Sequence, residues 1–96
     1  MATSHLRLDE ATRISELAFL PYRGVVSAHV DDASFALSVL DEGGKQLLSV
    51  PHIARTQYSD PIHLAGLLEE ARLELSKDGY ALLPWSMPFQ AEIGTR

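Results

Sequence analysis

Residues 60–78 read DPIHLAGLLEEARLELSKD, a pattern that predicts one amphipathic helix with a defined start and end. Asp60 can cap the first turn, and Pro61 suits the first helical position because an amide hydrogen there would have no helical partner. Gly79 can adopt the left-handed conformation that ends a helix. The apolar residues recur three and four positions apart, so they share one face that needs covering: Leu64, Leu67, Leu68, Ala71 and Leu75.

The chain before this helix predicts a shorter helix followed by three strands. Residues 9–20 predict a helix that Asp9 caps and that Pro21 ends, since helical geometry is disfavoured just before a proline. Strands are predicted at 25–30, 33–40 and 45–52, with Pro51 ending the third. The loops between them are short and polar, which favours antiparallel hairpins. The apolar residues of the shorter helix are Ala11, Ile14, Leu17 and Ala18.

The predicted register gives the sheet one apolar face. Pairing Val30 with Ala33 closes the first hairpin, and pairing Leu40 with Lys45 closes the second. The opposed pairs are then Val26–Leu37, Ala28–Phe35, Leu37–Leu48 and Phe35–Val50. Because side chains alternate between the faces of a strand, the opposite face is mainly serine and histidine. Such a sheet needs helices on only one side.

These elements predict a small α+β domain: helix, three-stranded antiparallel meander, helix, with both helices on one face of the sheet. Residues 80–83 are a candidate fourth, short strand. The 96 residues suffice for one domain, so we expect a single domain over 1–96, ordered from about residue 6 to 89 and frayed over 90–96.

Composition narrows the classes of function. The chain has no cysteine, which excludes disulfides and thiolate metal sites, and it has no apolar run long enough to span a membrane. The N-terminal residues lack the apolar core of a signal peptide, so we expect a cytoplasmic protein without membrane contact. The net charge is −5 and no basic cluster occurs, which argues against nucleic-acid binding.

No motif for catalysis or metal binding is found, so we expect a non-enzymatic protein without a cofactor. His29 with Asp31, and His52 with His63, are the pairs that the topology could bring together, although neither has a recognised metal-ligand spacing. The glycine pair at 43–44 before Lys45 lacks the rest of a phosphate-binding loop. A small-ligand-binding domain built on the histidine pairs remains an alternative.

The C-terminal segment is far more apolar than a chain terminus requires. It either folds back onto a small core or contacts a partner, and the sequence leaves both open. Ile62 and Leu73 lie on the side of the 60–78 helix opposite its main stripe. We therefore expect an interaction module that binds a protein partner or a second copy, as a homodimer. The alternative is an antitoxin-like or regulatory partner of a basic protein. The candidate contact residues are Ile62, Leu73, Leu82, Leu83, Trp85, Met87 and Phe89.

The order helix, meander, helix resembles the double-stranded-RNA-binding fold, and residues 35–84 resemble HicB-type antitoxins, which use a related half-fold. The resemblance lies in the turn 41–44 between strands, Pro51, the helix start at Ser59 and Asp60, and residues 68–71. The proline-glycine-cysteine stretch of HicB proteins is not matched at 51–55. The lysine-rich helix start of RNA binders is replaced at 59–63. The resemblance implies a fold and not a function.

Overall fold

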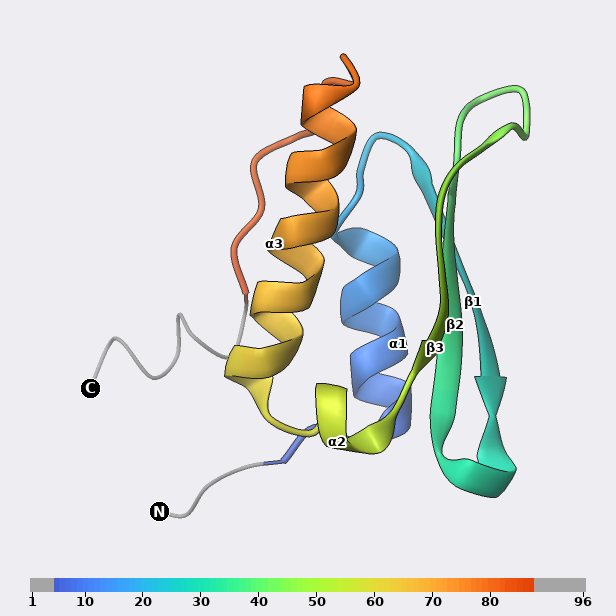
Figure 1. Ribbon diagram of the computed structural model, residues 1–96, viewed down its shortest axis with the longest axis vertical. Coiled ribbons are helices and arrows are strands. Elements are labelled where there is room, and N and C mark those ends of the chain that lie inside the picture. Colours follow the sequence, from blue (N-terminus) through green and yellow to red (C-terminus); the bar gives the residue numbers. More distant parts are fainter. Residues whose placement is uncertain (1–4, 88–96) are drawn as a thin grey trace.

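The computed structural model describes residues 5–87, which fold into a three-stranded antiparallel sheet with helices on one face (Figure 1). The predicted α+β class and element order are confirmed. The strand order is β1-β2-β3, and α1 packs on β1 and β2 while α3 contacts β3. The elements are α1 (Leu8–Leu17), β1 (Arg23–His29), the 3₁₀ turn η1 (Val30–Asp32), β2 (Ser34–Leu40), β3 (Gln46–Ile53), α2 (Arg55–Tyr58) and α3 (Pro61–Lys77).

Helix α3 forms as the sequence predicts. The Asp60 carboxylate accepts a hydrogen bond of 3.0 Å from the Ile62 amide, and Pro61 occupies the first turn. Gly79 has a φ of 99°, in the left-handed region. Four of the five stripe residues are buried and the fifth, Leu67, is half-buried against the same core.

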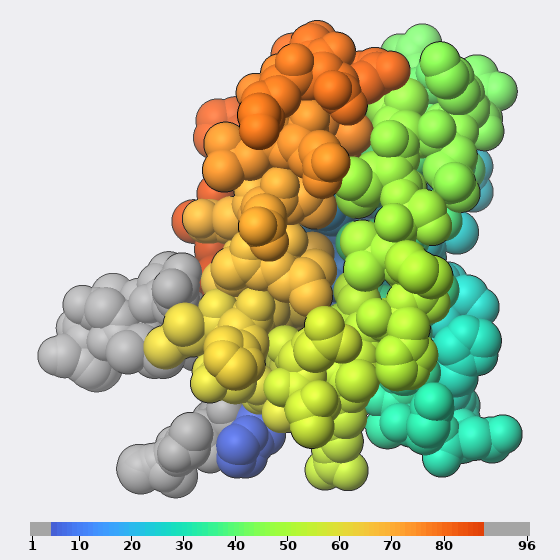
Figure 2. All heavy atoms as spheres, viewed as in Figure 1, coloured from blue at the N-terminus to red at the C-terminus, as the bar shows by residue number. Residues whose placement is uncertain are grey.

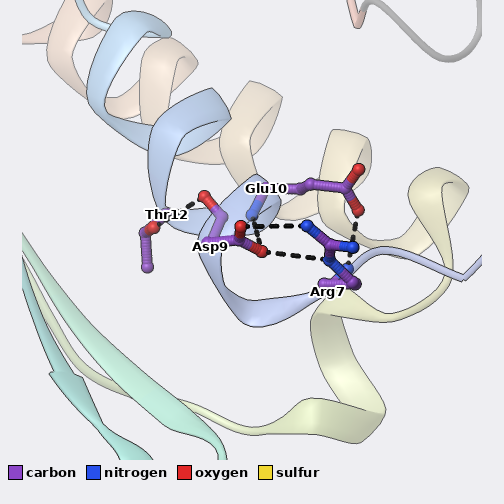
Figure 3. Close-up of polar contacts among 4 residues, drawn as sticks. All are labelled: Arg7, Asp9, Glu10 and Thr12. Atoms are coloured by element: carbon purple, nitrogen blue, oxygen red, sulfur yellow. Dashed lines mark hydrogen bonds and ion pairs between the residues drawn. The ribbon is translucent and has the colours of Figure 1, made fainter.

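Helix α1 begins differently from the prediction, because Arg7 and not Asp9 is the capping residue. The Glu10 carboxylate accepts a hydrogen bond of 2.9 Å from the Arg7 amide (Figure 3). Asp9 lies inside the first turn, where the positive end of the helix dipole favours a carboxylate, and it forms an ion pair of 3.1 Å with Arg7. The Arg7 guanidinium thereby lowers the pKa of Asp9. The helix also ends at Leu17, and the side chain of Leu17 is exposed.

The first hairpin has the predicted register, but the second does not. Val26 lies opposite Leu37 as expected, whereas Val30 leaves the strand and enters η1. Leu37 lies opposite Val50 and not Leu48, because Leu40 pairs with Gln46 and the pairing shifts again between Val39 and Leu40. Around Leu37 and Val39 the displacement is two residues, which keeps Leu48 and Val50 on the apolar face despite the wrong register. Phe35, by a further shift, lies opposite Ile53.

Two other predicted boundaries are wrong. Strand β3 continues through Pro51 to Ile53, because β3 is an edge strand and a missing amide hydrogen can face away from the sheet there. Residues 80–83 form no strand and instead run along the helices. Between β3 and α3, the short helix α2 ends in the buried Tyr58, whose hydroxyl donates to the Ala33 carbonyl at 2.6 Å.

One continuous core lies between the sheet and the helices. Phe35, Leu37 and Val39 contribute from the central strand β2, and all three are fully buried. Helix α1 approaches β1 so closely that a Cβ atom on Gly24 would lie 2.7 Å from the backbone oxygen of Glu16. Gly24 is therefore required by the contact between these two elements. No helix within residues 5–87 combines the length and apolar character that crossing a bilayer requires.

The two glycines at positions 24 and 66 predict opposite effects on stability. Gly24→Ala should lower the free energy of unfolding by about 1–3 kcal/mol, because backbone atoms must move to admit the methyl group. Gly66→Ala should raise it by about 0.5–1 kcal/mol, since Gly66 lies within α3 and a Cβ there meets no atom within 4 Å. Urea unfolding of both variants measures the difference. Equal midpoints for Gly24→Ala and the wild type would contradict the close contact.

Candidate functional site

The C-terminal segment, residues 80–87, crosses the side of the helices that faces away from the sheet (Figure 1). Met87 at its end is fully buried in the core, while Leu82 and Trp85 are half-buried against it. The Leu83 amide donates a hydrogen bond of 2.8 Å to the carbonyl of Leu20, just after α1. The segment therefore folds back onto its own domain.

Arg72 of α3 fastens this segment to both helices. One guanidinium nitrogen donates to the Ala18 carbonyl at 2.7 Å, and another donates to the Leu83 carbonyl at 2.9 Å. The guanidinium carbon also lies 5.8 Å from the ring centre of Trp85, within the range of a cation–π contact. The planar group with several donors suits this bridging role, which a lysine could not fill in the same way.

The segment and α3 enclose an open groove of about 590 Å³, which we call the α3 groove. One wall comes from α3 residues spaced three and four apart, which therefore share a face of the helix. The other wall comes from the C-terminal segment. Figure 2 shows α3 as a major part of one face of the molecule, with the start of the C-terminal segment emerging beside it. The groove is lined by Glu69, Arg72, Leu73, Ser76, Tyr80, Ala81, Leu82 and Trp85.

The candidate contact residues divide into three groups. Ile62, Leu73 and Leu83 are exposed, with 62%, 63% and 51% of their surface accessible, so the domain's own core does not use them. Leu82 and Trp85 are half-buried and line the α3 groove, which Leu73 shares. The remaining two candidates are not exposed contacts of the described structure: Met87 is fully buried, and Phe89 lies outside residues 5–87 together with the predicted frayed end at 90–96.

The histidine pairs considered from the sequence are replaced by a different contact. Nε2 of His52 lies 3.7 Å from a carboxylate oxygen of Asp32, beyond β1, whereas no ion pair between His29 and Asp31 occurs among the described residues. His52 lies in β3 and His63 in the first turn of α3. The buried Ser34 hydroxyl donates to the same carboxylate at 2.7 Å. Within residues 5–87, no three histidine or acidic residues are grouped to hold a metal ion.

The glycine pair before Lys45 cannot receive a phosphate in this conformation. The Asp41 carboxylate accepts hydrogen bonds from the amides of Gly43 and Lys45, at 2.9 and 2.8 Å. Gly44 has a φ of 87° and donates to the Asp41 carbonyl. An internal carboxylate thus occupies the place that an anion would take.

Two residues of these polar sites were not singled out from the sequence. Arg72 lies within α3 beside Ala71 of the buried stripe, and no local pattern predicts that its side chain reaches the Ala18 carbonyl. Asp32 lies in a loop that the sequence predicts to be a short hairpin connection. Helix η1 turns its carboxylate toward β3 instead.

Comparison with family models gives one match, which covers residues 9–75, from α1 to the last turns of α3. Its description is "Protein of unknown function (DUF1652)". The match covers more than half of the chain, and the chain belongs to this family. The comparisons with curated proteins and with solved structures gave no significant match. The C-terminal segment lies beyond the matched residues.

Replacing Arg72 tests whether its hydrogen bonds hold the C-terminal segment against the helices. Arg72→Ala should lower the free energy of unfolding by about 1.5–3 kcal/mol, because it leaves two backbone carbonyls without their charged donor. Trp85 fluorescence should shift to longer wavelength as the ring gains solvent. Arg13→Ala is the control, since Arg13 is exposed and has no hydrogen bond or ion pair with the described residues. Equal stability of the two variants would contradict the role.

The Asp32 carboxylate predicts a specific pH dependence. The hydrogen bond from Ser34, with a smaller contribution from His52, lowers the pKa of Asp32 below its ordinary 3.8. Because the folded pKa is the lower one, this contribution to stability is complete above pH 3.8 and is lost as pH falls through the folded pKa. NMR titration of the carboxyl carbon should show a higher pKa in Ser34→Ala. An unchanged titration would remove Ser34 as the cause.

Proposed function

We propose that this DUF1652 protein is a non-enzymatic interaction module that binds a protein partner in the α3 groove. The observation that carries the proposal is the strongly exposed Leu73 in a groove whose other wall holds Trp85 and Leu82. Large aromatic and apolar residues beside a pocket are typical anchors of protein interfaces. Arg72 fixes the Trp85 wall, so the surface is held in one conformation before a partner arrives.

The charges around the α3 groove indicate the chemistry of this partner. Glu69, Glu70 and Glu74 are exposed on α3, and the ion pairs found within residues 5–87 involve none of them. Arg72 donates to backbone carbonyls, and the ion pairs found within residues 5–87 do not join it to these glutamates. One of these carboxylates, Glu69, lines the groove, and the other two lie outside its lining on the same helix. Acidic groups beside exposed apolar side chains favour a partner segment that carries both basic and apolar residues. This supports a regulatory or antitoxin-like role toward a basic protein.

The non-enzymatic part of the proposal rests on the polar contacts around Asp32. The Ser34 hydroxyl donates its hydrogen to a carboxylate, and the nearest imidazole nitrogen lies 3.7 Å from that group. The Ser34 side chain is also buried, which keeps its hydroxyl away from a substrate outside the domain. We also propose that the module acts in the cytoplasm, which its cysteine-free sequence supports.

Binding of a small ligand is the second candidate function. The volume of the α3 groove, about 590 Å³, falls within the range of small-molecule sites. The groove combines the Trp85 and Tyr80 rings with one carboxylate and one guanidinium. A ligand bound there would be a small aromatic or apolar molecule with a polar group.

Site-specific photo-crosslinking separates these two functions. A photoreactive phenylalanine replaces Leu73 in the full chain, and a matched probe replaces Thr56, an exposed residue of α2. In a lysate of the source organism, the probe at 73 should give one protein adduct that the probe at 56 does not give. Reversing the charge of the groove carboxylate by Glu69→Lys should reduce this adduct at least severalfold.

The outcomes are distinct. An adduct that requires Glu69 supports the interaction module with a basic partner. Equal adducts at positions 73 and 56, or an adduct that the charge reversal leaves unchanged, contradict it. A rise in melting temperature with a small metabolite, abolished in Trp85→Ala, would favour the ligand-binding function instead.

A further inference from the structure

The two edges of the sheet differ in how they resist pairing with another strand. The free edge of β3 contains Pro51, which has no amide hydrogen, and the pairing of β3 with β2 shifts twice. Strand β1 pairs with β2 over seven residues without a shift, and it contains no proline or lysine. Irregularities, prolines and lysines are the features that keep an edge strand from adding a partner. The edge of β1 lacks them.

Apolar side chains flank this edge. Leu17 and Leu20 at the end of α1 and Val25 of β1 are 51%, 43% and 38% exposed. They line an open groove of about 440 Å³ together with Glu16, Tyr22, Arg23, Gly24 and Val26. Leu17 belongs to the predicted apolar stripe of α1, but its side chain is exposed and does not pack in the domain's own core.

The charge distribution indicates what pairs here. Each copy carries a net charge of −5, so two copies repel each other over most of their surfaces. Residues 17–30 contain no aspartate or glutamate, and their charged residue is Arg23. The carboxylates that directly flank this stretch are Glu16, at the rim of the groove, and Asp31 in η1. A second copy can approach along β1 with less repulsion than along α3, which carries several exposed glutamates.

We propose that β1 pairs antiparallel with β1 of a second copy and joins two three-stranded sheets into one. Alternate residues of an antiparallel strand direct their amide and carbonyl groups to opposite neighbours. When β1 pairs with its own copy, an odd-numbered residue must therefore lie opposite an odd-numbered one, and an even-numbered residue opposite an even-numbered one. The twofold axis then passes beside one residue and not between two. An axis at Val26 uses all seven residues of β1 and pairs Arg23 with His29 and Val25 with Ser27.

This register also matches charge. It brings Arg23 at the start of one β1 toward the η1 turn of the second copy, which carries the exposed Asp31. The twofold axis repeats this favourable contact at the other end. On the helix side, the two Val26 side chains face each other across the axis. The interface is thus apolar at its centre and oppositely charged at its ends.

Sedimentation velocity with matched variants tests the proposal. The wild-type chain should sediment as two copies in the micromolar range, and Val25→Lys, which adds a charge to the exposed edge, should sediment as one copy. Leu73→Lys is the control, because it places the same charge on an apolar residue of the α3 groove. Circular dichroism confirms that each variant remains folded.

A single cysteine tests the register. The chain has no native cysteine, and Val26→Cys would place two sulfur atoms across the axis, where directly opposed Cβ atoms lie about 4.5–5.5 Å apart. Mild oxidation should link Val26→Cys copies covalently and leave Leu73→Cys copies unlinked. A wild-type chain that sediments as one copy overturns the proposal. A two-copy species that Val25→Lys leaves intact and Leu73→Lys disrupts also overturns it. Covalent linkage of Leu73→Cys copies in place of Val26→Cys copies has the same meaning.

Discussion

The whole fold depends on covering one face of a three-stranded sheet. Phe35, Leu37 and Val39 of the central strand are fully buried, and they require both helices above them. A chain of 96 residues without cysteine has no covalent link to hold this arrangement, and a domain of this size buries a limited fraction of its surface. Apolar side chains from outside the regular elements are therefore drawn into the core, as Phe19 after α1 and Met87 show.

The recruitment of Met87 determines the outer surface of the helices. To reach the core, the C-terminal segment must cross α3 and the end of α1, and its polar backbone needs partners along the way. Arg72 and the Leu20 carbonyl supply them. The crossing covers the helices only in part, so Leu73 stays exposed beside Trp85. The α3 groove thus results from the way the domain completes its core, because α3 and the C-terminal segment supply both of its walls.

Local patterns predicted much of this fold because period and capping depend on neighbouring residues. Asp60 and Gly79 bound α3 as expected, and alternation found the apolar face of the sheet. The predicted register of the second hairpin is wrong because two irregular pairings cannot be read from alternation. The displacement at Leu37 and Val39 is two residues, so the apolar face is preserved there. The predicted cap of α1 at Asp9 is wrong because the Glu10 carboxylate accepts the hydrogen bond of the Arg7 amide, so the helix begins earlier. Arg72 was missed because its partners, at Ala18 and Leu83, are distant in sequence and their approach depends on tertiary packing.

The two surfaces that this fold leaves open meet at the end of α1. The Ala18 carbonyl accepts the hydrogen bond of Arg72, and the Leu20 carbonyl accepts that of Leu83, so the backbone here supports the wall of the α3 groove. The side chains of Leu17 and Leu20 face the groove beside β1. An association along β1 that restrains these side chains would also restrain the carbonyls that position Arg72 and Leu83. The interactions proposed for the two surfaces would therefore share the backbone of residues 18–20 as a common support.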